Sequence, residues 1–485
     1  MGKGLVMMHI DGVGHRFLVR ALEEGRMPKL AALMRSEGYD ALPYRCGIPS
    51  TTPFCQAGIL YGDNSEIPSY RWWDKEANLL VAFGHGSSFK KVAGKYFQGR
   101  EPLTQDGAVI GSCYPAGARD TFALAYRERD TSGGSGSGSS LALILAFFSS
   151  PLRVAAWLRH GIMALVETAA MAIRARLQGH HPERAYVISD MLEEIFLHHV
   201  ARYAVRQAMK KGFPTIYAGF YAYDETAHGF GPEDGYCYRM LGHVDHTIGE
   251  IAAHRAGHGG TPSDYELVIL SDHGQVESEP FNHSDGKTLG EIISGHLPDH
   301  SIQEYKGGRY GPDPEQAAGR IALTYSGGLA HLYLTNVPGR LGAADLDARF
   351  PGLIEKIAAL DRIAFVMLRD GAGGTLVSAA GRVEMGTAAA SELLARYDDP
   401  AILGPQLEFL NSFERSGEMV IFGENRNDLQ VNFEHQAGGH GSIGGDQVLP
   451  FILAKRSWDL DTTSIRGAKD VYPLLKSLRD RLAGD

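Results

Sequence analysis

Four short apolar runs, separated by segments with helical periodicity, constrain the fold more than any other feature of this sequence. The runs occupy residues 4–10, 213–223, 266–271 and 447–454. Runs of this length that alternate with amphipathic helices predict a mostly parallel sheet with helices on both faces. In such sheets, ligands bind at the edge where the strands reach their carboxyl ends. We therefore expect a doubly wound α/β fold with its functional residues at that edge.

The composition excludes several classes of protein. The chain has 485 residues, of which 44% are hydrophobic and 21% charged, as in globular proteins. A net charge of -10 argues against a general nucleic-acid binder, which needs a basic face. The four cysteines have no C-x-x-C spacing, so they predict neither a disulfide framework nor a cysteine zinc site. No signal-peptide pattern precedes the first apolar run, and we expect a cytoplasmic protein.

The middle of the chain carries an unusual insertion. Residues 131–140 read TSGGSGSGSS, which predicts a flexible linker. Residues 141–177 are the most apolar part of the chain, but Pro151 and Arg153 interrupt them, so an unbroken apolar span of about 20 residues is missing. Three interpretations remain: a partly buried helical hairpin, which this interruption favours, an element on a membrane surface with its arginines at the headgroups, or a transmembrane helix.

These patterns predict the domain organisation. We expect the first part of a catalytic core at 1–130, the linker and apolar helical insertion at 131–180, and the second part of the core at 181–485. A small cap is expected around 285–430, where the sequence shows no chemistry of its own.

Acidic and imidazole side chains stand at the ends of all four apolar runs. They are Asp11, Asp224, His228, Asp272, His273 and His440. Singly, each has an ordinary explanation as a turn, a helix cap or a surface residue. Together, three carboxylates at one sheet edge carry too much charge to be buried unpaired. Carboxylates and neutral imidazoles are good Zn²⁺ ligands, and six of them divide into two three-ligand metal sites.

Eight further histidines are expected to be packing, surface or supporting residues. They are His9, His180, His181, His198, His199, His243, His246 and His435.

The segment GIPSTTPFCQAGILYG at 47–62 offers the nucleophile. Ser50, Thr51, Thr52 and Cys55 lie where a loop enters a helix. A hydroxyl there is activated by metal coordination, and the backbone N–H groups of the helix start attract a phosphate. The alternative is that these residues only cap the helix.

In this order, the motifs resemble the alkaline phosphatase superfamily, most closely the type I phosphodiesterase/nucleotide pyrophosphatase group. The matching motifs are Asp11-Gly12, Pro49-Ser50-Thr51-Thr52, Asp224-x-x-x-His228, Ser271-Asp272-His273-Gly274 and His440-Gly441. The phrases at 56–76 and 217–231 are also similar to a bacterial, partly membrane-associated subgroup of phosphodiesterase-like proteins.

The resemblance implies an alkaline-phosphatase-like fold and a two-zinc hydrolase, with Mn²⁺ as an alternative metal. It implies that Thr52 is the nucleophile and forms a phosphothreonine intermediate during hydrolysis of phosphate diesters or pyrophosphates. One zinc would be held by Asp11, Thr52, Asp272 and His273, and the other by Asp224, His228 and His440.

One departure from the family pattern concerns the substrate oxyanion. Where the family has H-G-I-x-x-N with an Asn that holds a phosphoryl oxygen, this chain has SYRWWDKE at 69–76. We therefore expect substrate contacts from Gln56, Arg71 and Trp72, with ordinary core packing as the alternative for the aromatic residues. A C-x-P-x-R sulfatase signature is missing.

Other activities fit the same scaffold. The enzyme alternatives are a phosphomonoesterase, a phosphonate hydrolase, a headgroup phosphotransferase and a Mn²⁺-dependent phosphomutase. The alternative outside enzymes is a non-catalytic, membrane-tethered metal-binding protein. The expected partners are a small phosphate ester or a lipid headgroup, with membrane-surface contact through 141–177 and no nucleic-acid polymer.

Overall fold

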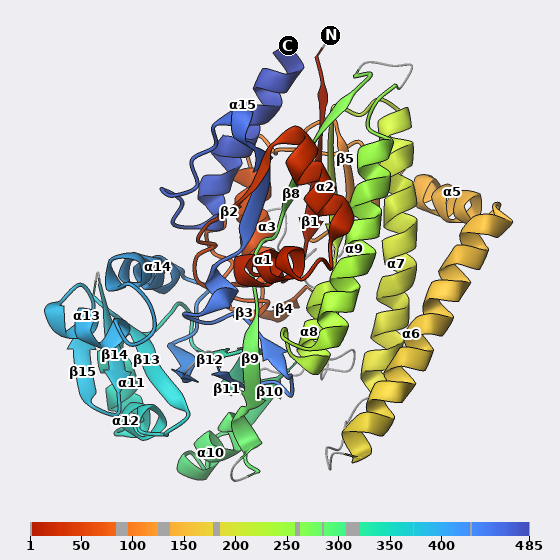
Figure 1. Cartoon of the computed structure of the whole chain (residues 1–485). Helices are drawn as coiled ribbons and strands as arrows, with labels where there is room; N and C mark the ends of the chain where they lie inside the picture. The colour runs from red at the N-terminus through yellow and green to blue at the C-terminus, as the bar shows by residue number, and fades with distance from the viewer. Residues whose placement is uncertain are drawn as a thin grey trace.

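The computed structural model has a central seven-stranded sheet with helices on both faces (Figure 1). It describes residues 2–83, 96–124, 136–177, 185–257, 262–283, 286–306, 321–371, 373–426 and 429–484. The strand order is β2 (Tyr39–Pro43), β20 (Phe451–Lys455), β8 (Tyr265–Leu270), β1 (Gly4–Ile10), β7 (Thr215–Phe220), β5 (Ala108–Ser112) and β6 (Asp120–Leu124). Strands β8 to β6 pair in parallel, whereas β20 is antiparallel to β8 and β2. This confirms the predicted α/β class.

Alternate side chains of β1 enter two different hydrophobic cores. Leu5 and Met7 belong to one core, and Val6 and Met8 to the other. Successive side chains of a strand point to opposite faces, so a strand that is apolar throughout must be covered on both sides. One face is covered by α3 (Thr52–Tyr61) and α15 (Val471–Gly484), and the other by α1 (His15–Glu23), α2 (Pro28–Glu37), α7 (Ala185–Lys210) and α9 (Gly235–Ala253).

The helical pattern that runs through residues 15–38 forms two helices instead of one. Helix α1 ends before Gly25, which has a left-handed φ of 69°, and Pro28 begins α2. Glycine adopts this conformation without steric cost, and proline is favoured at the start of a helix. Both breakers are visible in the sequence, but the apolar periodicity continues across them.

A second seven-stranded sheet occupies most of the region expected to be a small cap. Its order is β10 (Ile302–Tyr305), β11 (Ile321–Ser326), β12 (Leu329–Leu334), β16 (Met419–Gly423), β13 (Ile363–Asp370), β14 (Gly373–Ser378) and β15 (Gly381–Glu384). Four helices accompany it: α11 (Ala343–Arg349), α12 (Leu353–Ala358), α13 (Ala388–Leu394) and α14 (Pro400–Ser412). The turn between β11 and β12 approaches the central sheet, where the N–H of Gly328 donates to the carbonyl of His440 at 3.4 Å.

Smaller elements connect the two sheets. A four-stranded sheet has the order β17 (Asn425–Arg426), β18 (Leu429–Asn432), β9 (Val276–Pro280) and β19 (Gly438–Gly439), and β3 (Arg71–Asp74) pairs with β4 (Leu79–Ala82). The remaining elements are helices α8 (Ala222–Phe230) and α10 (Leu289–His296) and 3-10 turns at 281–283, 446–448, 456–458 and 468–470. Because β19 pairs with β9, the segment before β20 is held beside the segment after β8.

The apolar insertion forms two helices on the outside of the molecule. These are α5 (Gly136–Phe148) and α6 (Pro151–Leu177), and α6 packs along α7 (Figure 1). Of the linker expected over 131–140, residues 136–140 instead form the start of α5, and residues 131–135 lie outside the described part of the chain. Among the described residues, the length and hydropathy needed for a membrane span are not met by any individual helix.

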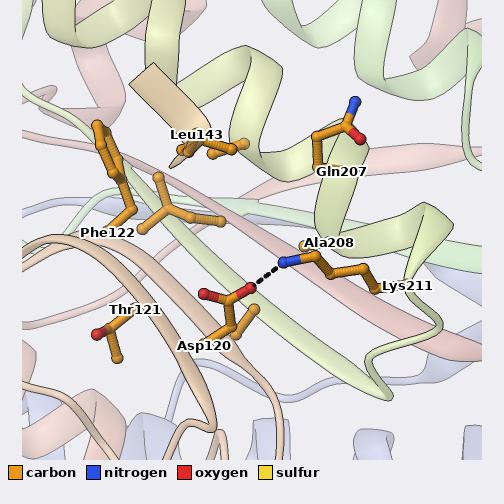
Figure 2. Close-up of a pocket in the computed structure, with 10 residues that line it drawn as sticks. Asp120, Thr121, Phe122, Leu143, Gln207, Ala208 and Lys211 are labelled. Atoms are coloured by element: carbon orange, nitrogen blue, oxygen red, sulfur yellow. Dashed lines mark hydrogen bonds and ion pairs between the residues drawn. The ribbon is translucent and has the colours of Figure 1, made fainter. Parts of the chain in front are cut away.

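A small crevice marks the place where α5 meets the edge of the central sheet. Figure 2 shows it beside β6, with Leu143 of α5 near Phe122 and with an ion pair between Asp120 and Lys211. Its volume is about 30 Å³, which is room for about one water molecule. Asp120 is the first residue of β6, so the crevice lies at the amino edge of the parallel strands, opposite the edge where ligands are expected.

Candidate active site

The seven residues predicted as metal ligands and nucleophile converge at the carboxyl edge of the central sheet. Asp11 follows β1, Asp272 follows β8, and Asp224 lies in the first turn of α8, directly after β7. His440 reaches the same edge from the other direction. Because β20 is antiparallel to β8, the chain that precedes β20 lies where β8 ends.

Asp224, His228 and His440 form one group of potential metal ligands. His228 Nε2 lies 3.2 Å from Asp224 Oδ2 and 3.2 Å from His440 Nε2, and His440 Nε2 lies 3.8 Å from Asp224 Oδ1. Asp224 and His228 are four residues apart on α8, so they lie on one face of the helix. The three side chains can bind one cation together.

Asp11, Thr52, Asp272 and His273 form a second group beside the first. Thr52 Oγ1 lies 3.1 Å from His273 Nε2, which is 3.5 Å from Asp11 Oδ1 and 3.6 Å from Asp272 Oδ2. The rings of His273 and His440 stack with their centroids 3.9 Å apart. The two groups are therefore neighbours in one site.

Each of the three histidines is oriented by a backbone carbonyl. The Nδ1 atoms of His228, His273 and His440 lie 2.9, 3.0 and 2.7 Å from the carbonyl oxygens of Gly438, Gly274 and Ser50. A carbonyl only accepts hydrogen bonds, so in the neutral imidazole Nδ1 carries the proton and Nε2 keeps its lone pair. This is the usual arrangement of histidines that bind metals through Nε2.

The electrostatics of the pocket fit divalent cations. Asp11 Oδ1 and Asp272 Oδ2 are buried and have no hydrogen-bond partner within the described part of the chain. Burial, together with the charges of Asp272 and Asp224, raises the pKa of Asp11 well above its usual value. A cation held by these carboxylates would supply the missing partner and relieve the repulsion.

The pKa values of the histidines follow from their neighbours. Burial lowers the pKa of His440 to about 3, helped by the charge of His273. Burial also disfavours the charged form of His228, but the charge of Asp224 outweighs burial and raises the pKa of His228 to about 9.

The donor atoms of the site indicate which metals it suits. Carboxylate and imidazole donors of this kind suit Zn²⁺, and Mn²⁺ accepts the same oxygen ligands.

His9 also lies beside the site, in the supporting position that was one of the roles expected for it. It lies on β1 two residues before Asp11, on the same face of the strand. His9 Nε2 lies 2.9 Å from Asp272 Oδ1 and 3.8 Å from Asp11 Oδ1. The signal in the sequence was an imidazole inside an otherwise apolar, buried strand.

Gln56 supports His9 and does not face an open pocket. Its Oε1 accepts hydrogen bonds from the N–H of Cys113 at 2.8 Å and the hydroxyl of Ser112 at 3.0 Å, which fixes the orientation of the amide. Its Nε2 then faces His9 Nδ1 at 3.4 Å and donates to the hydroxyl of Tyr221 at 2.8 Å. The expected contact between Gln56 and substrate does not fit this fully buried, saturated amide.

Arg71 and Trp72 also differ from their expected roles in substrate binding. Trp72 is 0% exposed and packs against Phe83 in the hydrophobic core, so the core-packing alternative describes it. Arg71 donates to the carbonyl of Tyr325 at 2.6 Å and pairs with Glu434 at 3.0 Å. The periodicity of a four-residue strand could not show which of its faces is buried.

Among the candidate nucleophiles, Thr52 is the one whose oxygen faces the metal-type ligands. Ser50 instead accepts a hydrogen bond from the N–H of Gly441 at 2.9 Å and lies 3.2 Å from Gln447 Oε1. Cys55 lies in the hydrophobic core. Thr51 precedes α3 without a side-chain capping bond.

Comparison with known proteins shows the family and the fold of the chain. The family model for type I phosphodiesterase / nucleotide pyrophosphatase matches residues 5–294. No curated protein matches the sequence significantly. The fold is similar to human ectonucleotide pyrophosphatase / phosphodiesterase 5, with a TM-score of 0.51, 11% identity and coverage of 99% of this chain and 95% of that one.

Two further structures are similar to the chain. The murine ectonucleotide pyrophosphatase / phosphodiesterase 5 has a TM-score of 0.50 and 12% identity, over 99% of this chain and 95% of that one. Phosphonoacetate hydrolase from Sinorhizobium meliloti 1021, in complex with phosphonoacetate, has a TM-score of 0.49 and 13% identity, over 98% and 96%. Since the family model covers more than half of the chain, this protein is a phosphoric ester hydrolase that belongs to the type I phosphodiesterase / nucleotide pyrophosphatase family.

Proposed function

We propose that the protein hydrolyses phosphate diesters or pyrophosphates of small molecules through a covalent intermediate on Thr52, at a site for two divalent cations. The observation that carries this proposal is the position of Thr52 Oγ1, 3.1 Å from His273 Nε2 at the first residue of α3. A structural metal site has no need for a hydroxyl at this place. A nucleophile needs to lie there, beside the metal and at the start of a helix.

Each of the two groups of residues is expected to bind one cation. One cation is assigned to Asp11, Thr52, Asp272 and His273, on the distances of 3.1, 3.5 and 3.6 Å that join His273 Nε2 to the other three side chains. The other is assigned to Asp224, His228 and His440. We expect Zn²⁺ in both positions, with Mn²⁺ as the alternative. When bound, such a pair of ions lowers the pKa of a coordinated hydroxyl or water and neutralises charge on the transferred phosphoryl group.

The chain itself positions and receives the phosphoryl group. The oxygen of Thr52 forms a bond to phosphorus while the bond to the leaving oxygen breaks, and the leaving oxygen takes up a proton. Water then attacks the phosphorus, and Thr52 is released with its hydroxyl restored. Helix α3 begins without a side-chain cap, so its first N–H groups remain available to stabilise the phosphoryl oxygens.

The substrate class follows from size and charge. Asp11, Thr52, Asp224, Asp272 and His273 are buried, and His228 and His440 are partly buried. Together with the net charge of -10, this favours a small ester over a nucleic-acid polymer. A phosphorylated lipid headgroup has the same chemistry, and comparison of a soluble diester with a phospholipid distinguishes the two sources.

A matched pair of variants tests the nucleophile. Thr52→Val and Thr51→Val each remove one hydroxyl and keep the shape of the side chain. We expect Thr52→Val to lower kcat for bis(p-nitrophenyl) phosphate by on the order of a thousandfold or more, and Thr51→Val to retain most of it. Bound metal, measured by elemental analysis, should persist in both variants.

The outcomes separate the parts of the proposal. Full activity of Thr52→Val would rule out the covalent route. Preference for p-nitrophenyl phosphate over the diester would make the protein a monoesterase, and cleavage of a phosphonate alone would make it a phosphonate hydrolase. A preparation that binds metal but hydrolyses none of these compounds would exclude the diesterase activity.

A further inference from the structure

Large apolar side chains are exposed almost exclusively on the insertion. Among the described residues, eight of the nine exposed large hydrophobic side chains lie between positions 145 and 166. They are Leu145, Phe148, Leu152, Leu158, Ile162, Met163, Leu165 and Val166. We call these eight residues the α5–α6 patch. An exposed apolar cluster of this kind marks an interaction surface, whereas single exposed residues such as Leu429 are ordinary.

Helix α6 has its apolar face turned away from the protein. Leu152, Ile162 and Val166 are 83%, 60% and 64% exposed. The opposite face contacts α7, where Trp157 packs edge-on against Phe196 and His160 Nδ1 lies 3.0 Å from His199 Nε2. A helix on the surface of a globular protein normally buries its apolar face and exposes its polar one. Helix α6 has the reverse orientation, with apolar side chains exposed to the surroundings. Such a surface is stable when an apolar environment covers it.

Helix α5 continues the patch on the other side of the bend between the two helices. Its Leu143 and Phe147 pack toward the protein, Leu143 beside Phe122 at the crevice in Figure 2, while Leu145 and Phe148 face outward. The two helical segments 142–148 and 151–163 meet at an angle of 86°. This bend is incompatible with a straight span, but it lets both segments lie along one surface.

The charge of the insertion indicates the chemistry of its partner. Residues 136–177 contain four arginines and a single acidic residue, Glu167, in a chain whose net charge is -10. Arg159 is exposed within the outward face of α6. Apolar side chains combined with arginines are typical of helices that lie in the interface of an anionic bilayer.

We propose that the α5–α6 patch docks the protein on an anionic lipid membrane, with both helices in the plane of the surface. A second copy of the chain is a poorer occupant, because pairing two copies of this patch would bring the exposed Arg159 of both copies into one apolar interface. A bilayer accepts the apolar side chains and attracts the positive ones. The proposal depends on the surface alone and does not rest on the proposed function.

Vesicle co-sedimentation tests the docking with the full-length protein. The probes are vesicles of phosphatidylcholine alone and vesicles that also contain phosphatidylglycerol. We expect binding to the anionic vesicles, weaker binding to the neutral ones, and a decrease in high salt. Ile162→Glu and Val166→Glu should each weaken binding by about tenfold or more, because each puts a charge in place of an aliphatic group that is expected to enter the lipid.

The control is Leu429→Glu, which places the same charge on the single exposed large apolar residue found elsewhere in the described chain. It should bind vesicles like the wild type. All three variants should hydrolyse bis(p-nitrophenyl) phosphate like the wild type, and this would show that they are folded. Vesicle binding is a separate readout, which can be measured even if the wild type lacks that activity. The proposal is overturned if the wild type stays in the supernatant, or if the Ile162 and Val166 variants still sediment. It is also overturned if light scattering shows a patch-dependent dimer that ignores vesicles.

Discussion

His9 Nε2 lies 2.9 Å from Asp272 Oδ1 in a fully buried contact. Because the amide of Gln56 faces His9 Nδ1, that nitrogen accepts and Nε2 carries the proton. His9 therefore contacts one oxygen of Asp272, whereas Asp272 Oδ2 lies 3.6 Å from His273 Nε2 and has no hydrogen-bond partner among the described residues. This makes His9 a positioning residue for a carboxylate that we assign to a cation.

Removing the imidazole of His9 should weaken metal binding. We expect His9→Leu to lower the affinity for Zn²⁺ or Mn²⁺ by about 10–100-fold, as is usual for residues that orient a metal ligand, and to lower kcat accordingly. His9→Gln retains an N–H donor and should recover part of the affinity. Competition with a chelator measures both.

The matched control is His331, which is also 0% exposed and is bonded to Gly417 N, outside the site. His331→Leu should destabilise the fold without changing metal affinity. Equal losses of affinity in His331→Leu and His9→Leu would show that the effect of His9 is general destabilisation.

Metal removal should destabilise the folded protein. Asp11, Asp224 and Asp272 are buried close together, and the pKa of Asp11 is raised by burial and by the other two carboxylates. Without a cation their repulsion opposes folding, and a bound ligand stabilises the native state by mass action. We expect a chelator to lower Tm by several degrees and abolish hydrolysis, and added Zn²⁺ or Mn²⁺ to restore both. An unchanged Tm during complete metal removal would contradict the assignment.

Gly12 should tolerate no side chain. It has a φ of 74°, and a Cβ atom there would lie 2.3 Å from Asp224 Oδ1. Gly25 has a similar φ of 69° but open space around its Cβ position, so Gly25→Ala carries only the cost of the left-handed backbone, about 1 kcal/mol. We expect Gly12→Ala to lower kcat by at least tenfold and Gly25→Ala to leave it nearly unchanged, after correction for the folded fraction. Similar kcat values in both variants would show that the close contact of Gly12 with Asp224 does not matter for hydrolysis.

The attachment of α6 should weaken in acid. Burial lowers the pKa of His160 from 6.5 to about 3 and those of His199 and His243 to about 4. These values lie below that of a free imidazole, so the detached state binds more protons. The contact is therefore fully stable above about pH 6.5 and is lost progressively as the pH falls toward 4.

The surrounding charges strengthen this prediction. Arg202 lies 3.2 Å from His199 and Arg159 also opposes protonation of His160, whereas Glu250 is shared between Arg202 and His246. Hydrogen exchange over α6 should rise between pH 6.5 and 5, and His160→Gln should flatten this dependence. An exchange rate that follows only the intrinsic chemical effect of pH would contradict it.

The arrangement of apolar runs and the residues at their ends determined the fold class and most of the candidate site. Asp11 and Asp272 could be placed because the carboxyl ends of parallel strands meet at one edge. Thr52 could be placed because an ordered set of motifs accompanied it. These features depend on neighbours in sequence and on a sheet geometry that has few alternatives.

Other features were decided by the tertiary structure. His440 enters the site through an antiparallel strand, and Trp72 is buried although it lies beside a predicted binding segment. His9 acquires its role only because Gln56 and Asp272, from distant parts of the chain, meet it on either side. Likewise, periodicity shows that α6 is a helix but not which face its neighbours cover, because burial depends on the surface that other elements leave open.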